Sequence, residues 1–223
     1  PVLEIGCGTG LLSVELASLM SGRSLTLSDL APAMVGHCRR KIDLMGRAHP
    51  DIQYEVLDGE QLTRQGVYAL ICANFAVHWF VDMEAGLSRL LQALKPGGYL
   101  LCSYPGPGSY RQWHQHCARL GVPCSANLLP SSASVAEIFA AHPVKICQWE
   151  RELELSFSTA HDFLRHFKCT GADMPTRPEA VPLRSAQLRK LIRGWDQACP
   201  DGVEVNCAIN FLAVEKEGES SGS

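Results

Sequence analysis

The sequence lacks a long apolar run and an excess of charge of either sign. No stretch approaches the roughly 20 consecutive apolar residues that a membrane-spanning helix needs. The 223 residues include 20 basic and 23 acidic side chains, for a formal net charge of −3, and no stripe that combines basic and aromatic residues. We therefore expect a protein that binds neither membranes nor nucleic acids.

The sequence also lacks paired cysteines, although it contains ten of them. None forms a C-x-x-C pair, which argues against a zinc site or a dithiol redox site, and we expect no metal. Cys72 and Cys102 lie inside apolar runs, where a thiol behaves as a small hydrophobic group. Scattered thiols of this kind are typical of a reducing compartment, so we expect a cytoplasmic protein.

The first ten residues carry the strongest local pattern. A short run over 2–5 contains Glu4 and is followed by Gly6, Gly8 and Gly10, and a helical pattern begins at Leu11. This predicts a buried strand, a tight turn and a helix N-terminus, whose unpaired N–H groups can bind an anionic or polar ligand. The spacing is G-x-G-x-G and not the G-x-G-x-x-G of dinucleotide-binding proteins, which disfavours a nicotinamide enzyme. An ordinary strand-to-helix turn is the alternative interpretation.

The pattern that follows alternates between strands and helices. The expected strands cover 24–29, 52–56, 67–73 and 99–103, the expected helices cover 11–20, 32–45 and 83–94, and 95–98 is expected to be a turn. Five such alternations predict an α/β fold with a doubly wound, mostly parallel sheet. Further strands over 144–157 and 203–214 would complete seven strands, in an order that the sequence leaves open.

Polar residues follow several of these strands. Asp29 ends the second strand about 20 residues after the glycines, Asp58 follows the third, and Asn74 follows the fourth. In a doubly wound sheet the carboxyl ends of the strands are where ligands bind. Asp58 with the following glycine is a common turn by itself, but the set predicts a binding site at this edge.

Together these motifs, with the 95–98 turn, resemble the class I S-adenosylmethionine-dependent methyltransferases over residues 1–104. The resemblance implies S-adenosyl-L-methionine as the cofactor. Gly6 and Gly8 would cradle its methionine part, Asp29 would bind both ribose hydroxyls, Asp58 would meet the adenine amine, and Asn74 would lie near the reacting methyl group. The implied cofactor-binding residues are Glu4, Gly6, Cys7, Gly8, Gly10, Asp29, Leu30, Asp58, Gly59, Glu60, Asn74 and Phe75.

A narrower resemblance extends over nearly the whole chain. Segments 74–80, 104–110, 163–172 and 183–188 resemble the malonyl-acyl-carrier-protein O-methyltransferases of biotin synthesis. This implies methylation of the free carboxylate of a malonyl thioester, with an acyl-carrier protein or a small acyl thioester as partner. Two alternatives stay open: a methyltransferase for another small molecule, and a non-catalytic assembly partner that binds S-adenosylmethionine.

Members of that family carry several dozen residues before the glycine turn, which form helices over the cofactor. The present sequence begins at Pro1, directly before the first strand. We expect either a fragment or a chain without that cover, in which exclusion of water from the site would be weaker.

The expected acceptor is a carboxylate, which is already ionised at neutral pH and needs no general base. It needs a cationic partner in a dry site, and the planar fork of arginine suits it. Arg111 is the first candidate, with Arg165 and Arg177 as alternatives, although each also fits a surface position. Trp79 and His78, which follow the fourth strand, complete the predicted catalytic set. Trp79 either forms a wall of the site or belongs to the core. His78 either contacts the substrate or is a satisfied polar residue.

The second half of the chain is less regular. We expect a single domain over 1–223: a core over 1–104, an insertion with cap and edge elements over 105–200, a closing strand over 203–214 and a disordered tail over 215–223. Helical patterns cover 160–169 and 185–195. A basic cluster on and beside the second of these helices either steers an acidic carrier protein or forms a solvated helix face: Arg184, Arg189, Lys190 and Arg193. We expect a monomer.

Overall fold

The computed structural model describes residues 1–124, 128–169 and 183–218. They form two compact units, and strands β6 and β7 contribute to both. The first unit comprises Pro1–Tyr104, Ser131–Trp149 and the chain from Asn210; the second comprises Pro105–Pro130 and Glu150–Ile209. The expected division into a 1–104 core and a 105–200 insertion stays a prediction, and the grouping in the structure differs because part of the insertion packs with the first unit.

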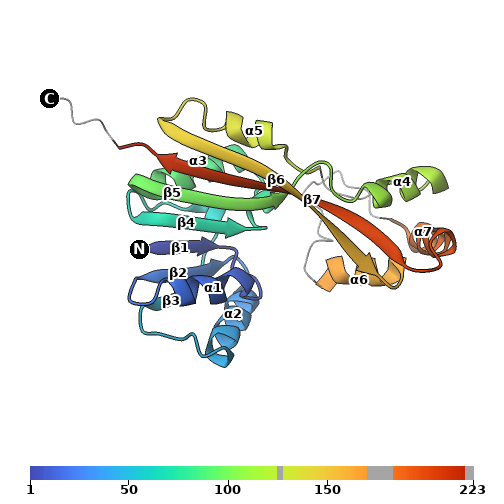
Figure 1. The fold of residues 1–223 in the computed structure, drawn as a ribbon, viewed down its shortest axis with the longest axis horizontal. Helices are drawn as coiled ribbons and strands as arrows, with labels where there is room; N and C mark the ends of the chain where they lie inside the picture. Colours follow the sequence, from blue (N-terminus) through green and yellow to red (C-terminus); the bar gives the residue numbers. More distant parts are fainter. Residues whose placement is uncertain (125–127, 170–182, 219–223) are drawn as a thin grey trace. The chain divides into compact units, whose positions relative to one another are not determined.

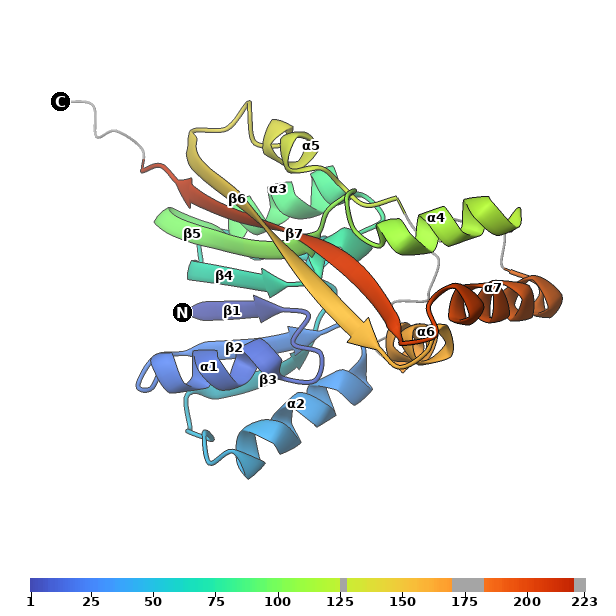
Figure 2. The same ribbon diagram turned by 45° about the vertical axis from the view of Figure 1, so that its right-hand side comes forward.

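Seven strands form one sheet in the order β3-β2-β1-β4-β5-β7-β6 (Figure 1). The strands are β1 (Val2–Ile5), β2 (Leu25–Asp29), β3 (Ile52–Val56), β4 (Tyr68–Asn74), β5 (Leu94–Pro105), β6 (Val144–Phe157) and β7 (Val203–Lys216). The first five pair in parallel, whereas the arrow of β7 runs against those of β5 and β6 (Figure 2). This confirms the predicted seven-stranded, mostly parallel, doubly wound sheet. Its strand order reverses between β1 and β4, which is where such sheets bind ligands.

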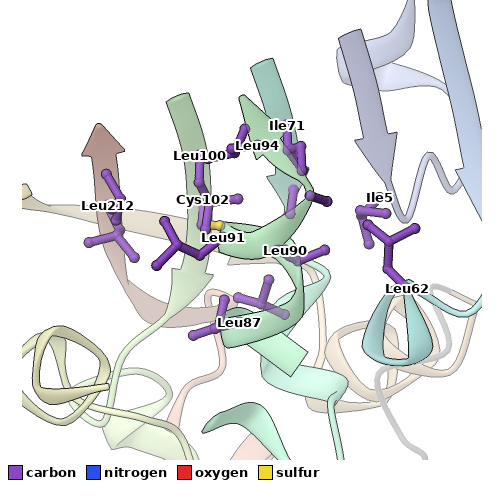
Figure 3. Packing of buried hydrophobic residues seen from close by; sticks show 14 of the residues in the cluster. Ile5, Leu62, Ile71, Leu87, Leu90, Leu91, Leu94, Leu100, Cys102 and Leu212 are labelled. Atoms are coloured by element: carbon purple, nitrogen blue, oxygen red, sulfur yellow. The ribbon is translucent and has the colours of Figure 1, made fainter. Parts of the chain in front are cut away.

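Helices cover both faces of the sheet in the first unit. Because side chains alternate along β1, Val2 packs with α1 (Leu11–Leu19) and α2 (Pro32–Leu44), whereas Leu3 packs on the other face with α3 (Met83–Ala93). Figure 3 shows the second of these clusters, in which leucines of α3 meet side chains of β4, β5 and β7. Asp82 caps α3 as expected, since its carboxylate accepts the Ala85 N–H at 2.9 Å.

The fifth strand differs from the sequence prediction at its start. The structure includes residues 95–98 in β5, where the sequence predicts a turn. Tyr68 pairs with Leu94, but Leu70 pairs with Tyr99, so 95–98 bulge outward opposite one residue of β4. Gly97 has a φ of 74° in this bulge. The glycines of this segment do bend the chain locally, but β4 and β5 pair on both sides of the bend, so the strand continues through it.

The second unit is built on aromatic packing. Helices α4 (Arg111–Leu120), α6 (Ala160–Cys169) and α7 (Ser185–Ala198) enclose Trp113, Phe163 and Trp195 together with residues of β7. Helix α5 (Ser132–Glu137) belongs to the first unit. Within the described ranges, none of the helices has the length and apolarity required to cross a membrane.

The end of the chain corrects one prediction. Glu215 and Lys216 belong to β7 and not to a disordered tail. Glu215 pairs with Lys145 at 3.6 Å, and the Glu217 N–H donates to the Pro143 carbonyl at 2.9 Å. These contacts come from a neighbouring strand and cannot be read from the polar composition of the segment. Residues 219–223 lie outside the described residues.

Candidate functional site

The glycine turn connects β1 to α1 and passes very close to the segment after β4. All three glycines have positive φ, at 70° for Gly6, 50° for Gly8 and 80° for Gly10. A Cβ atom built on Gly6 would lie 2.5 Å from the Cβ of Ala76, far inside van der Waals contact. Only glycine satisfies both the dihedral angle and the space at this position. Ala76 is a site neighbour that the sequence pattern does not indicate.

Asp29, the last residue of β2, is fixed against the glycine turn. Its Oδ2 accepts the Gly8 N–H at 2.9 Å, and its Oδ1 accepts the Ala31 N–H at 2.9 Å. The side chain is half-buried, and each carboxylate oxygen can accept more than one hydrogen bond. The structure thus brings two motifs, 21 residues apart in sequence, into direct contact.

Glu4 and Cys7 are buried beside the turn. Glu4 is 1% exposed, and the Ser13 hydroxyl donates to its Oε2 at 2.6 Å. Burial raises the pKa of Glu4 to about 8, so this carboxyl is largely protonated at neutral pH. A hydrogen bond from Cys7 lowers the pKa of Cys38 to about 7 and raises that of Cys7. The side chains of Glu4 and Cys7 therefore have structural partners, and their cofactor contacts stay predictions.

The end of β3 leads into a short 3₁₀ helix, η1 (Gly59–Gln61). The Asp58 carboxylate caps it, accepting the Glu60 N–H at 3.0 Å. Gly59 packs on β1, because a Cβ atom there would lie 2.4 Å from Cγ2 of Ile5. Leu30, which follows β2, is 68% exposed and offers an apolar surface.

The Glu60 carboxylate binds backbone N–H groups before α3, a role that the sequence did not indicate. One carboxylate oxygen accepts the Val81 N–H at 2.9 Å, and the other accepts the Asp82 N–H at 2.7 Å. Arg89 of α3 donates to the Glu60 carbonyl at 2.8 Å. Glu60 thus holds the segment that enters α3, and a contact between its carboxylate and a cofactor would compete with these bonds.

The end of β4 is conformationally strained. Phe75 has a φ of 52°, one of two positive values among non-glycine residues in the described chain. Its N–H donates to the Ser103 carbonyl at 2.8 Å, while the Ser103 hydroxyl donates to Oδ1 of Asn74 at 2.5 Å. Strain of this kind is concentrated at functional sites. Ser103 is a further neighbour that only the register of β4 and β5 identifies.

His78 and Trp79 lie in the next short helix, η2 (Val77–Trp79). The His78 ring lies edge-on to Phe75 at 6.2 Å and packs beside Trp79 at 4.8 Å between ring centroids. Burial lowers the pKa of His78 to about 4, so the imidazole is neutral at pH 7. Its Nδ1 has no hydrogen-bond partner among the described residues, which does not fit the alternative of a satisfied polar residue.

The predicted carboxylate-binding arginines that the structure describes, Arg111 and Arg165, belong to the second unit. Arg111 is the first residue of α4 in the second unit, and its guanidinium pairs with Glu152. Arg165 of α6 pairs with Asp162 at 2.9 Å. Arg177 lies outside the described residues. A role for Arg111 at the acceptor stays a prediction.

The first unit therefore brings the glycine turn, the carboxylates of Asp29 and Asp58 and the amide of Asn74 to the carboxyl ends of four adjacent parallel strands. Such an edge can bind a ligand that combines hydroxyl, amine and apolar parts. Within the described ranges, no three histidine, cysteine, aspartate or glutamate side chains are grouped to hold a metal ion.

Comparisons with known proteins agree with this geometry. A family model described as "Methyltransferase domain" matches residues 2–98. The biotin biosynthesis bifunctional protein BioCD of Bordetella avium is 38% identical over 197 residues, 88% of this chain and 40% of that protein, so the chain spans less than half of this relative.

A second relative matches over more of its own length. The malonyl-[acyl-carrier protein] O-methyltransferase of Magnetococcus marinus is 31% identical over 193 residues, 86% of this chain and 69% of that protein. Among solved structures, the YcgJ protein of Bacillus subtilis shares the fold, with a TM-score of 0.67 at 14% identity over 97% of this chain and 92% of that one. The chain belongs to the malonyl-[acyl-carrier protein] O-methyltransferase family.

Proposed function

We propose that this chain transfers a methyl group from S-adenosyl-L-methionine to the free carboxylate of a malonyl thioester on an acyl-carrier protein, as a step of biotin synthesis. The observation that carries the proposal is the contact of the glycine turn with Asp29, within a chain of this family. It places a backbone N–H and a carboxylate side by side at the point where the strand order of the sheet reverses.

The cofactor roles follow the strand ends. Gly6 and Gly8 would hold the methionine part, Asp29 the ribose hydroxyls, and Asp58 the adenine amine. Asn74 would lie near the methyl group, held in place by the Ser103 hydroxyl. The exposed side chains of Leu30 and Phe75 offer apolar contacts to the same ligand.

Held by Gly6, Gly8 and Asp29, S-adenosyl-L-methionine would supply an electrophilic methyl group on a positively charged sulfur. The acceptor carboxylate is ionised at neutral pH, so the protein needs no general base. Its task is to hold the oxygen about 3 Å from the methyl carbon and in line with the sulfur–carbon bond. The imidazole of His78 is neutral at pH 7, so it could offer the acceptor a hydrogen bond but no charge. The product is a methyl ester, which removes the negative charge of the malonyl carboxylate.

The cofactor role of Asp29 gives a direct prediction. Asp29→Ala should weaken binding of S-adenosylhomocysteine by about 1–3 kcal/mol, since a charged hydrogen-bond acceptor is lost. Asp29→Asn keeps one acceptor oxygen, so its affinity should lie between those of the parent protein and Asp29→Ala. Isothermal titration calorimetry measures the affinities, with Asp43→Ala on the exposed face of α2 as the matched control. Equal affinities for Asp29→Ala and the parent protein would show that Asp29 does not bind the ribose.

The identity of the acceptor is tested by comparing methyl transfer to different substrates. Methyl transfer is measured with malonyl–carrier protein, with a small malonyl thioester and with unrelated small acids. Preference for the malonyl thioesters supports the proposal, whereas better turnover of an unrelated acid would favour a different small-molecule methyltransferase. Cofactor binding without transfer to any acceptor would favour a non-catalytic assembly partner.

Arg111 is proposed to hold the acceptor carboxylate. Arg111→Ala should raise the acceptor KM by about tenfold or more, with the affinity for S-adenosylhomocysteine unchanged, because a bidentate partner of the substrate is removed. Arg165→Ala is the matched control, since Arg165 also pairs with a single carboxylate in the second unit. A loss confined to Arg165→Ala would exchange the two assignments.

We further propose a cytoplasmic monomer. In support of a reducing setting, eight cysteines of the described chain are free thiols: Cys7, Cys38, Cys72, Cys102, Cys117, Cys147, Cys199 and Cys207.

A further inference from the structure

A groove on the second unit carries a concentration of positive charge. It lies between the C-terminal part of α4 and one side of α7 and has a volume of about 420 Å³. Its lining consists of Leu120, Ala186, Arg189, Lys190, Arg193, Gly194 and Gln197. We infer that this groove is the docking surface for an acidic face of the carrier protein, an inference that rests on the proposed function.

The groove is formed where helices α4 and α7 pack against each other. The α7 residues that line it recur at helical spacing, while Leu191 and Trp195 of the same helix are buried in the aromatic cluster. Helix α4 approaches closely at Gly194, where a Cβ atom would lie 2.8 Å from Cδ1 of Leu120. A larger residue at 194 would displace the Leu120 side chain from this contact.

Two polar contacts fix this crossing. The Lys190 ammonium donates to the Leu120 carbonyl at 2.6 Å, at the C-terminus of α4, where a cation is favourable. Arg119 donates to the Gly194 carbonyl at 2.9 Å. Lys190 therefore lines the groove and adds positive charge to it, and Arg119 helps to hold the two helices that form it.

The charge of these helices is one-sided. Together α4 and α7 contain five arginine and lysine residues and one acidic residue, Asp196. Asp196 accepts the Ala160 N–H at 2.7 Å, and Arg111 pairs with Glu152. The exposed Arg189 and Arg193 form no ion pair with any described residue. Such a surface is complementary to a partner rich in carboxylates.

The dimensions favour a protein partner over a small anion. The lining runs from Ala186 to Gln197, which is about 16 Å of α-helix. This length matches three turns of a helix on a partner, and the apolar side chain of Leu120 lies within it. An enzyme whose substrate is attached to a carrier protein needs a surface of this size to bind that carrier.

The experiment separates docking from chemistry. Arg189→Glu/Arg193→Glu should raise the KM for malonyl–carrier protein about tenfold or more, while kcat/KM for a small malonyl thioester stays unchanged. Arg189→Gln/Arg193→Gln should give a smaller increase in the same direction. The matched control is Arg23→Glu/Arg47→Glu, two exposed arginines of the first unit, which should leave both substrates unaffected.

Three outcomes would overturn the inference. Equal losses with both substrates would show that the arginines support the reaction or the fold and not docking. An unchanged KM for malonyl–carrier protein would show that the partner binds elsewhere. Tight binding of a single-stranded oligonucleotide that only the groove variant loses, with the carrier KM unchanged, would assign the groove to nucleic acid. If the parent protein methylates neither thioester, the proposed function fails independently of the groove.

Discussion

Gly6→Ala is expected to abolish measurable binding of S-adenosylhomocysteine and to lower the free energy of unfolding by about 2–5 kcal/mol. Two penalties add at this position. Alanine would have to adopt a φ of 70°, and its methyl group would lie 2.5 Å from the Cβ of Ala76. The turn can relieve this overlap only by moving away from the segment after β4, which would displace the N–H groups offered to the cofactor. Calorimetric titration and urea unfolding measure the two effects.

Two further variants separate the penalties. Gly22→Ala has a similar φ of 77°, but nothing lies within 4 Å of its new Cβ atom, so it should lose only about 1–2 kcal/mol and retain cofactor binding. The double variant Gly6→Ala/Ala76→Gly removes the overlap and should recover part of the stability. A double variant no more stable than Gly6→Ala would show that contact with Ala76 is not the cause.

Most elements of the first hundred residues, although not the 95–98 segment, were predictable because their signals are local. The apolar runs, the capping residue Asp82 and the glycine turn each act within a few residues, and the structure confirms the elements they predict. The order of β6 and β7 at the edge of the sheet was not predictable. It depends on pairing between strands that lie far apart in sequence, for which the chain carries no local signal.

The same distinction applies to the site. Asp29 and Asp58 could be located because one ends a strand and the other follows a strand, but the hydrogen bonds of Glu4 and Glu60 depend on distant partners. Glu60 binds the backbone 21 and 22 residues further along, and Asn74 binds Ser103 across a strand pair. An acidic residue next to a motif therefore indicates the edge of the sheet without indicating which side chains remain open to a ligand.

Glu4 leads to the second large prediction, a fall in stability as pH rises. Its pKa is raised from 4.5 to about 8, because burial disfavours the charged carboxylate. Between these values the unfolded chain releases the proton that the folded chain retains. The contribution of Glu4 is thus fully present below about pH 4.5 and is lost as pH rises toward 8, by up to about 1.4 kcal/mol per pH unit.

Glu4→Gln should remove this dependence. Glutamine is neutral at every pH and nearly the same shape, and its side-chain oxygen can still accept the Ser13 hydroxyl. In urea unfolding at pH 5, 6, 7 and 8, the variant should match the parent protein at the lowest pH and exceed its stability increasingly toward pH 8. Glu15→Gln, on the exposed side of α1, should follow the parent profile. If Glu4→Gln kept the parent slope, a group other than Glu4 would be responsible. If the parent instead became more stable toward pH 8 relative to the variant, the Glu4 carboxylate would have to be ionised in the folded chain.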